Sequence, residues 1–152
     1  MDPRKFTEKS LIALEVSQNE AIRRQNPQII SIHLLYALVI QENGLIPQLL
    51  EKMEVVLPTF QMQLAQQLDT LPTLSGSSST QVSGSGELNQ VLVNAEEKSK
   101  QMGDSFISVE HLLLSLVNEG KRGSAGRFLA NCGITKERIC KTLEEVRGHQ
   151  RV

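Results

Sequence analysis

Aromatic residues are scarce in this sequence: they make up 3% of its 152 residues, and tryptophan is absent. A packed core must therefore consist mainly of leucine, isoleucine, valine and alanine side chains. The sequence also lacks an apolar stretch of the ~18–20 residues that a membrane-spanning helix needs, and its N-terminus has no apolar run behind a basic segment. We therefore expect a cytoplasmic protein without a membrane-bound part.

The sequence also lacks an excess of charge of either sign, because 16 basic and 17 acidic residues leave a formal net charge of −1. Without a positive field, binding to nucleic acid or to an anionic membrane surface is not expected. Cysteine is limited to Cys132 and Cys140, which form no CxxC pair. We expect both to be buried or half-buried free thiols in a reducing compartment.

Residue patterns for catalysis are absent too. Nothing fits the phosphate-binding pattern GxxxxGK[ST], and the segment 123–126, with a glycine at each end, follows an expected helix and is interpreted as a turn. The three histidines are too few for a zinc site, which needs three or four convergent ligands. We therefore expect no catalytic activity, no cofactor and no metal ion in this chain.

The dominant positive feature is an internal repeat. The segment Ile29–Val39, IISIHLLYALV, returns as Ile107–Val117, ISVEHLLLSLV, with the histidines 78 residues apart. The same offset relates a stripe of residues spaced four apart that precedes each copy: Ala13, Ser17 and Ala21 before the first, and Val91, Ala95 and Ser99 before the second. After one added residue at positions 120–123 the offset becomes 79. A duplicated helical unit explains this register.

We predict an all-α fold of eight helices, built as two four-helix halves related by a pseudo-twofold axis. Thr7 caps the first helix, and Asn43-Gly44 closes the second with the glycine in a left-handed turn. The prediction is a single domain over residues 1–152: repeat one at 5–72, a small and polar linker at 73–86, and repeat two at 87–148.

The two halves differ in their polar residues. The duplicated histidines, His33 and His111, are expected to be packed helix-start residues that bond backbone or solvent. Only the second copy has an acid beside its histidine, because Glu110 stands where the first copy has Ile32. This glutamate and Asp104 flank a short turn, and they either cap free amides or form a polar contact surface together with Thr7. The pattern leaves both interpretations open.

Apolar residues around the start of the second half have two interpretations as well. An apolar groove between helices is a standard site for an extended or helical peptide. The same residues also suit the interior of the second half. The candidates are Leu88, Leu92, Phe106, Ile107 and Leu112.

Several segments resemble, in order and spacing, the N-terminal domain of the ClpB family of bacterial protein disaggregases. They are KFTEKSLIALEVSQNEA, NGLIPQLLEKM, LPTLSGSSS, ISVEHLLLSLV and GITKERICKTLEEVRGHQRV. The resemblance extends over essentially all 152 residues. The double repeat alone is shared with the ClpA and ClpC unfoldases, whereas the Leu71-Pro72 and Ser75-Gly76 junction and the segment 147–152 look specifically like ClpB.

This resemblance implies a regulatory domain from a longer protein, with residues 149–152 starting the connection to an ATPase module. The ATP and magnesium sites, the hexamer and the cooperation with the DnaK chaperone system belong to parts that are absent here. The family's N-terminal domain engages unfolded or aggregated polypeptide through an apolar groove on its second half. A polar cluster contributes to chaperone activity. The isolated domain is expected to be monomeric.

The family's functional positions coincide with the residues already singled out. Its threonine and acidic pair match Thr7, Asp104 and Glu110. Its groove positions match Leu88, Leu92, Phe106, Ile107 and Leu112. One departure is the segment 83–85, Ser-Gly-Ser, where the family commonly has an aromatic residue, leucine and serine. The departure implies either weaker substrate binding or replacement of the missing side chains by Val82.

Two other functions stay open. An adaptor-binding N-terminal domain of a ClpA/ClpC-type degradative unfoldase shares the double repeat. A free-standing helix-turn-helix regulator is disfavoured by the balanced charge. For a substrate groove that buries ~200–300 Å² of apolar surface, we expect micromolar or weaker affinity, because association costs offset most of the gain.

Overall fold

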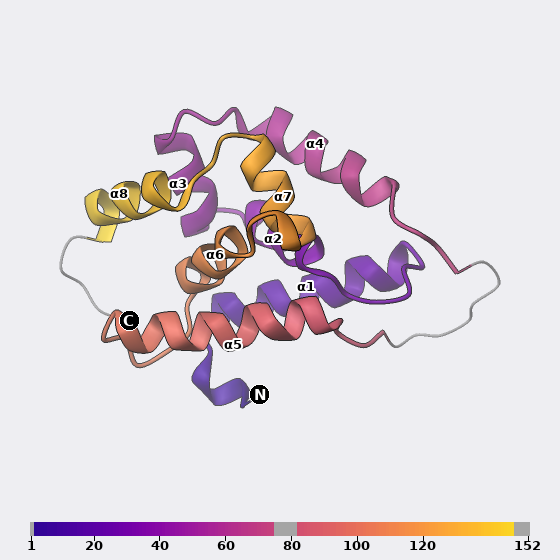
Figure 1. Cartoon of the computed structure of the whole chain (residues 1–152), viewed down its shortest axis with the longest axis horizontal. Helices are drawn as coiled ribbons and strands as arrows, with labels where there is room; N and C mark the ends of the chain where they lie inside the picture. Colours follow the sequence, from indigo (N-terminus) through magenta and orange to yellow (C-terminus); the bar gives the residue numbers. More distant parts are fainter. Residues whose placement is uncertain (1, 75–81, 148–152) are drawn as a thin grey trace.

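The computed structural model describes residues 2–74 and 82–147. These residues form eight α-helices and two short 3-10 turns, Pro3–Lys5 and Gly120–Arg122, which confirms the predicted all-α fold (Figure 1). The helices are α1 (Glu8–Arg23), α2 (Ser31–Val39), α3 (Leu45–Lys52), α4 (Leu57–Asp69), α5 (Gly86–Gln101), α6 (Val109–Asn118), α7 (Ser124–Asn131) and α8 (Lys136–Arg147). The predicted connection at 149–152 lies outside the described residues.

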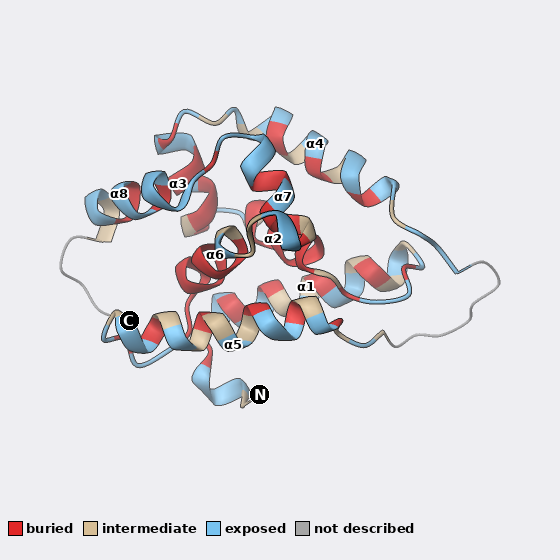
Figure 2. Cartoon of the chain, in the orientation of Figure 1, coloured by how far each residue is buried: buried red, intermediate tan, exposed pale blue. Residues whose placement is uncertain are grey.

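The two copies of the repeated segment form the central helices α2 and α6. Both are buried along almost their whole length, as Figure 2 shows, because they are apolar on nearly every side. Helix α1 packs on α2 and α5 packs on α6, while α3, α4, α7 and α8 cover the opposite side (Figure 1). The repeated segment is therefore the scaffold of each half.

Small side chains let the long helices α1 and α5 approach this centre closely. Ala13, Ser17 and Ala21 are buried on α1, and the equivalent stripe is buried on α5. In the second half the hydroxyl of Ser115 donates a 2.6 Å hydrogen bond to the carbonyl of Val91, which joins α6 to α5.

The two repeats are interlocked by a pair of short backbone bridges. Phe6, just before α1, pairs in parallel with Ile107, just before α6, and the flanking hydrogen bonds measure 3.0 and 2.8 Å. The symmetry-related pair joins Ile29, before α2, to Gly84, before α5, with flanking hydrogen bonds of 3.0 and 2.9 Å. The segment before the first helix of each repeat therefore pairs with a segment of the other repeat.

The predicted linker at 73–86 extends too far toward the C-terminus. Residues 75–81 lie outside the described part of the chain, but Val82 is already half-buried against the core. The hydroxyl of Ser85 accepts a 3.1 Å hydrogen bond from the amide of Leu88, so this serine is the cap of α5 and Gly86 is its first residue. The end of the polar run is thus a helix start rather than linker.

The left-handed residue after α2 is Asn43, with φ +55°, and not Gly44 as predicted. Gly44 has an extended backbone and precedes α3. A Cβ atom at this position would lie 2.9 Å from the Cβ of Gln41, so the glycine is required by close packing. The predicted cap of α1 is confirmed, since the hydroxyl of Thr7 accepts a 3.3 Å hydrogen bond from the amide of Ser10.

The predicted turn at 123–126 is wrong, because α7 begins at Ser124 and includes Gly126. A Cβ atom on Gly126 would lie 2.1 Å from the carbonyl oxygen of Gly120, so the glycine lets this helix pass very close to the preceding turn. The thiol prediction also needs correction: Cys132 and Cys140 are free but exposed, not buried or half-buried.

Candidate functional site

Each repeat has a buried histidine at the start of its central helix. The amide of Ser108 donates a 2.9 Å hydrogen bond to Nδ1 of His111, so the proton of this imidazole is on Nε2, which lies 2.6 Å from Oδ2 of Asp104. In repeat one, Nδ1 of His33 accepts from the amide of Ile30, and Nε2 faces an amide oxygen instead of a carboxylate. The prediction of packed helix-start histidines is confirmed.

In repeat one the partner of the histidine is neutral. Nε2 of His33 lies 2.8 Å from the side-chain oxygen of Asn26, which occupies the position of Asp104 in the repeat. Burial disfavours the charged imidazole and lowers the pKa of His33 from its usual 6.5 to about 4. This histidine is therefore neutral at physiological pH.

The acidic pair that the sequence singled out lies inside the protein. The side chain of Asp104 is fully buried and that of Glu110 is 4% exposed. Nη2 of Arg147, in the last turn of α8, donates a 2.5 Å hydrogen bond to Asp104, and its Nε lies 3.6 Å from a carboxylate oxygen of Glu110. The hydroxyl of Ser108 donates to the other oxygen of Glu110. Both acids therefore make internal ionic contacts.

Thr7 is the third member of the predicted polar cluster, and it is only half-buried. Its amide donates a 3.0 Å hydrogen bond to the carbonyl of Ile107, one residue before Ser108. The structure thus links the threonine to the segment that contains the acidic pair, but through backbone pairing. Thr7 caps α1, whereas the two acids bind Arg147.

Arg147 was missed by the sequence analysis, although the repeat holds a signal for it. Repeat one has Asn26, Ile32 and Leu68 at the positions that repeat two fills with Asp104, Glu110 and Arg147. All three positions change together, from a neutral set to a charged set. Such a joint change indicates a group of residues that act together, which a search within one copy does not reveal.

Ser108, His111 and Asp104 have the residue types and the order of contacts of a hydrolase triad. The serine hydroxyl lies 3.0 Å from Nδ1 of the histidine. However, the side chains of His111 and Asp104 are 0% exposed, and the serine is 5% exposed. A substrate has no access to this serine, so the geometry serves to order the start of α6.

The five predicted groove residues divide into two groups. Leu88, Ile107 and Leu112 are 5%, 1% and 0% exposed, and the structure places them in the core. Leu92 is half-buried on α5, and Phe106 is 47% exposed in the loop between α5 and α6. Only the last two have apolar surface to offer a partner.

A size exchange between the repeats explains why Leu88 is buried. Repeat one combines a large Phe6 with a small Ser10, and repeat two has Gly84 and Leu88 at the equivalent positions. The Cδ2 atom of Leu88 lies 3.4 Å from the point where a Cβ of Gly84 would be. Leu88 thus lies in contact with the space that a side chain at position 84 would fill, and Val82 is half-buried against the core.

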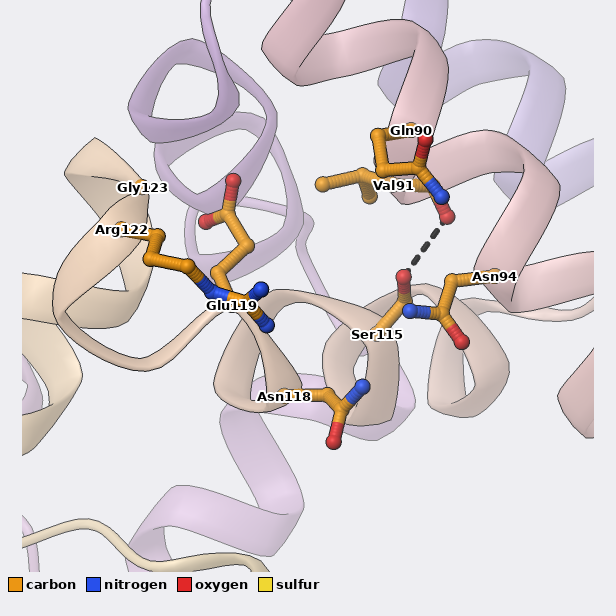
Figure 3. Close-up of a pocket in the computed structure, with 8 residues that line it drawn as sticks. All are labelled: Gln90, Val91, Asn94, Ser115, Asn118, Glu119, Arg122 and Gly123. Carbon is orange, nitrogen blue, oxygen red and sulfur yellow. Dashed lines mark hydrogen bonds between the residues drawn. The ribbon is translucent and has the colours of Figure 1, made fainter.

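A hollow of about 270 Å³ that is lined mostly by residues with polar side chains lies between α5 and the end of α6 (Figure 3). Its lining includes three side-chain amides, those of Gln90, Asn94 and Asn118. The equivalent residues of repeat one are Ile12, Val16 and Ile40. The same place in the fold is therefore polar in one half and apolar in the other.

The apolar counterpart in repeat one is partly open to solvent. Ile12 is 40% exposed and Ile40 is 36% exposed. The end of α2 is held against α1 here, because the side chain of Gln41 donates a 2.9 Å hydrogen bond to the carbonyl of Lys9. Sequence reasoning missed this patch, since each isoleucine suits a helix interior. Comparison with the amides of repeat two would have revealed it.

The repeats also meet at a half-buried carboxylate, that of Glu119. It accepts hydrogen bonds of 2.8 Å from the hydroxyl of Ser31 in repeat one and 3.1 Å from the amide of Gly126. Loss of hydration, with the nearby carboxylate of Glu87 as a smaller cause, raises the pKa of Glu119 from 4.5 to about 7. In repeat one the equivalent residue is the neutral Gln41.

Two negative findings concern the described residues only. None of their helices combines the length and the apolar content needed to cross a lipid bilayer. Within the same ranges, 2–74 and 82–147, no group of three or more histidine, cysteine or acidic side chains is arranged to hold a metal ion.

The chain is similar in sequence to bacterial chaperones. The Clp repeat (R) N-terminal domain family matches residues 5–132. The chaperone protein ClpB of Clostridium perfringens is 40% identical over the whole chain, and that of Nitratidesulfovibrio vulgaris is 39% identical over the whole chain. In both cases the chain spans only 18% of the length of the relative.

Solved structures show the same fold. The N-terminal domain of Hsp104 from Candida albicans superposes with a TM-score of 0.83 at 22% identity, covering 97% of this chain and 94% of that one. A ClpV N-domain in complex with a VipB peptide gives a TM-score of 0.75 at 19% identity, covering 97% of this chain and 89% of that one.

Proposed function

Because the chain belongs to the Clp repeat N-terminal domain family, as the N-terminal domain of a ClpB-type chaperone, we propose that it recognises unfolded or aggregated polypeptide. It does so through apolar side chains that the fold leaves exposed. The chain spans 18% of its curated relatives, so the ATPase modules, with ATP and magnesium, are assigned to the remainder of a longer protein. We assign the hexamer and cooperation with the DnaK chaperone system to that longer protein.

The exposed ring of Phe106 is the observation that carries this proposal. It is 47% exposed in a chain with only 3% aromatic residues, and its neighbour Ile107 is fixed by the backbone bridge to the start of α1. The ring is thus presented on an ordered loop, where binding loses little conformational entropy. Repeat one has Gln28 at the same position, so the feature is specific to repeat two.

The available apolar area supports weak and reversible binding. Half of a phenylalanine side chain is about 100 Å², which corresponds to about 2–3 kcal/mol of transfer free energy before association costs. Leu92 contributes a smaller area because it is half-buried. Weak binding suits a domain that passes its substrate on to another part of the same protein.

The test is a titration of isotope-labelled domain with a permanently unfolded protein, followed by backbone amide shifts. We expect the largest shifts at Phe106 and along the exposed side of α5 near Leu92, and about a tenfold loss of affinity in Phe106→Gln, the residue of repeat one. The matched control is the double variant Ile12→Gln and Ile40→Asn, which removes an equal kind of surface from repeat one. If only this control loses binding, the recognition surface is in repeat one and the proposal fails.

An alternative function is binding of a folded adaptor protein, as in a ClpA/ClpC-type degradative unfoldase. The exposed isoleucines of repeat one, Ile12 and Ile40, favour it, because they offer apolar surface in addition to Phe106. Adaptor binding predicts that the encoded sequence beyond Val152 leads to a protease-docking loop in the second ATPase module. A long coiled-coil insertion in the first module supports the ClpB-type function instead.

A further inference from the structure

We propose that Asp104, Glu110 and Arg147 form a releasable ionic clasp that holds the end of α8. Asp104 lies before α6, Glu110 is in its first turn, and Arg147 is in the last turn of α8. The clasp therefore joins the last described turn of the domain to the start of its central helix. The inference rests on the proposed function in two respects: a longer protein continues beyond α8, and the loop with Phe106 binds substrate.

The last turn of α8 has little apolar packing of its own. The buried residues of α8 are Ile139, Thr142 and Leu143, all before the final turn, and Val146 is only half-buried. In α4, the equivalent helix of repeat one, Leu68 is 1% exposed and secures the final turn through burial. Arg147 takes the place of this leucine, so ionic contacts replace apolar packing at the end of α8.

The chemistry of the two endings differs in how easily they open. When Leu68 leaves its site, apolar surface is exposed to water. When Arg147 leaves its site, its guanidinium group recovers the hydration that it lost on burial, which compensates for part of the lost attraction. Nε of Arg147 is buried without a hydrogen bond among the described residues and lies 3.6 Å from the carboxylate of Glu110, so this contact is ionic and not a hydrogen bond.

The clasp also connects the end of α8 to the proposed binding loop. Phe106 lies between Asp104 and Glu110 in the sequence, and its neighbour Ile107 is bridged to the segment before α1. Release of Arg147 thus frees the end of α8 and removes the cation from two buried carboxylates on either side of the loop. In a longer protein, this geometry makes the direction in which the chain leaves the domain depend on the state of the loop.

The test compares amide hydrogen exchange in the last turn of α8, residues 144–147, with that in the last turn of α4, residues 66–69. The key variant combines Asp104→Asn, Glu110→Ile and Arg147→Leu, which are the residues of repeat one. We expect the variant to melt at or above the temperature of the wild type, and exchange at 144–147 to slow by about tenfold. Unchanged exchange at 144–147 in this variant would overturn the clasp.

A second measurement uses Arg147→Gln, which removes the cation and keeps a long side chain. We expect exchange at 144–147 to accelerate several-fold and exchange at 66–69 to stay unchanged. Equal exchange at 144–147 in this variant and in the wild type would overturn the proposal. The proposed function predicts that the triple variant still binds the unfolded protein, because the variant keeps Phe106 and Leu92. Titration of this variant therefore tests substrate binding separately from the clasp.

Discussion

The two repeats have the same four-helix arrangement but different polarity at equivalent positions. Repeat one has Gln28 where repeat two exposes Phe106, and it has Ile12 and Ile40 where repeat two has Gln90 and Asn118. The buried polar centre is neutral in repeat one and ionic in repeat two. The positions that pack α2 and α6 remain apolar in both. Duplication thus kept the scaffold and left the surface and the polar centre free to diverge.

The largest expected effect comes from breaking the ionic centre of repeat two at one residue. Arg147→Leu removes the guanidinium group that contacts the buried carboxylates of Asp104 and Glu110, and we expect a loss of about 3–5 kcal/mol in the free energy of unfolding. Urea denaturation measures it. The triple variant with the repeat-one residues should recover most of the loss. A cost below about 1 kcal/mol for the single change would show that the acids find other partners.

The exchange of a large and a small side chain between Gly84 and Leu88 is tested by restoring the arrangement of repeat one. Gly84→Phe alone overpacks the site beside Leu88 and should cost about 1–3 kcal/mol. Leu88→Ser alone should cost about 2–4 kcal/mol, because it leaves a cavity. The loss in the double variant should be at least about 1 kcal/mol smaller than the sum of the two single losses. Additive losses would mean that the two side chains occupy separate spaces.

Glu119 and His33 make the stability of the protein depend on pH in opposite directions. Its pKa is about 7 in the folded state and 4.5 without the fold, so the folded state binds the proton more tightly between these values. The contribution of Glu119 to the free energy of unfolding therefore increases on acidification below pH 7 and is lost as the pH rises through 7. His33 acts in the opposite direction, since its pKa is lowered to about 4 and stability falls as the pH decreases from 6.5 toward 4.

The variant Glu119→Gln, with the residue that repeat one has as Gln41, isolates the acidic contribution. We expect it to be more stable than the wild type by about 1 kcal/mol at pH 7.5, a figure reduced for the solvent-exposed part of the side chain, and equally stable at pH 5. Denaturation at the two pH values measures the difference. An identical gain at both would assign the effect to packing instead of ionisation.

The smallest expected effect is a gain of binding in repeat one. Gln28→Phe gives this half the exposed ring that Phe106 provides in repeat two. We expect the affinity for unfolded protein to increase about two- to fivefold, because a second weak site acts together with the first. The melting temperature should stay within about 2 °C, as the position is exposed. Unchanged affinity would show that a ring alone does not make a binding site.

The fold was predictable because two independent signals in the sequence agree. The leucines of α2 and α6 show helical burial, and the 78-residue register repeats that pattern. The prediction was less successful where packing between distant segments decides. Gly44 and Gly126 are required by close contacts with a neighbouring turn, and no local pattern distinguishes such glycines from those that close a helix.

The candidate site was predictable only in part, for a related reason. Thr7 was predicted as a helix cap, which the structure confirms. For Phe106 and Leu88 the pattern left both a groove and the core open; the structure exposes Phe106 and buries Leu88, which lies against the space beside Gly84. Arg147 was not predicted as a site residue, since its acidic partners belong to another part of the chain and its own helix pattern is ordinary.

The crossed bridges before α1 and α5 have a consequence for synthesis of the chain on the ribosome. The segment at Phe6 is made first, but its backbone partner at Ile107 emerges only after the first helix of the second half has been translated. Ile29 likewise waits for Gly84. A nascent first repeat therefore has its helices but not its final closure, and it must remain unaggregated until the second central helix arrives.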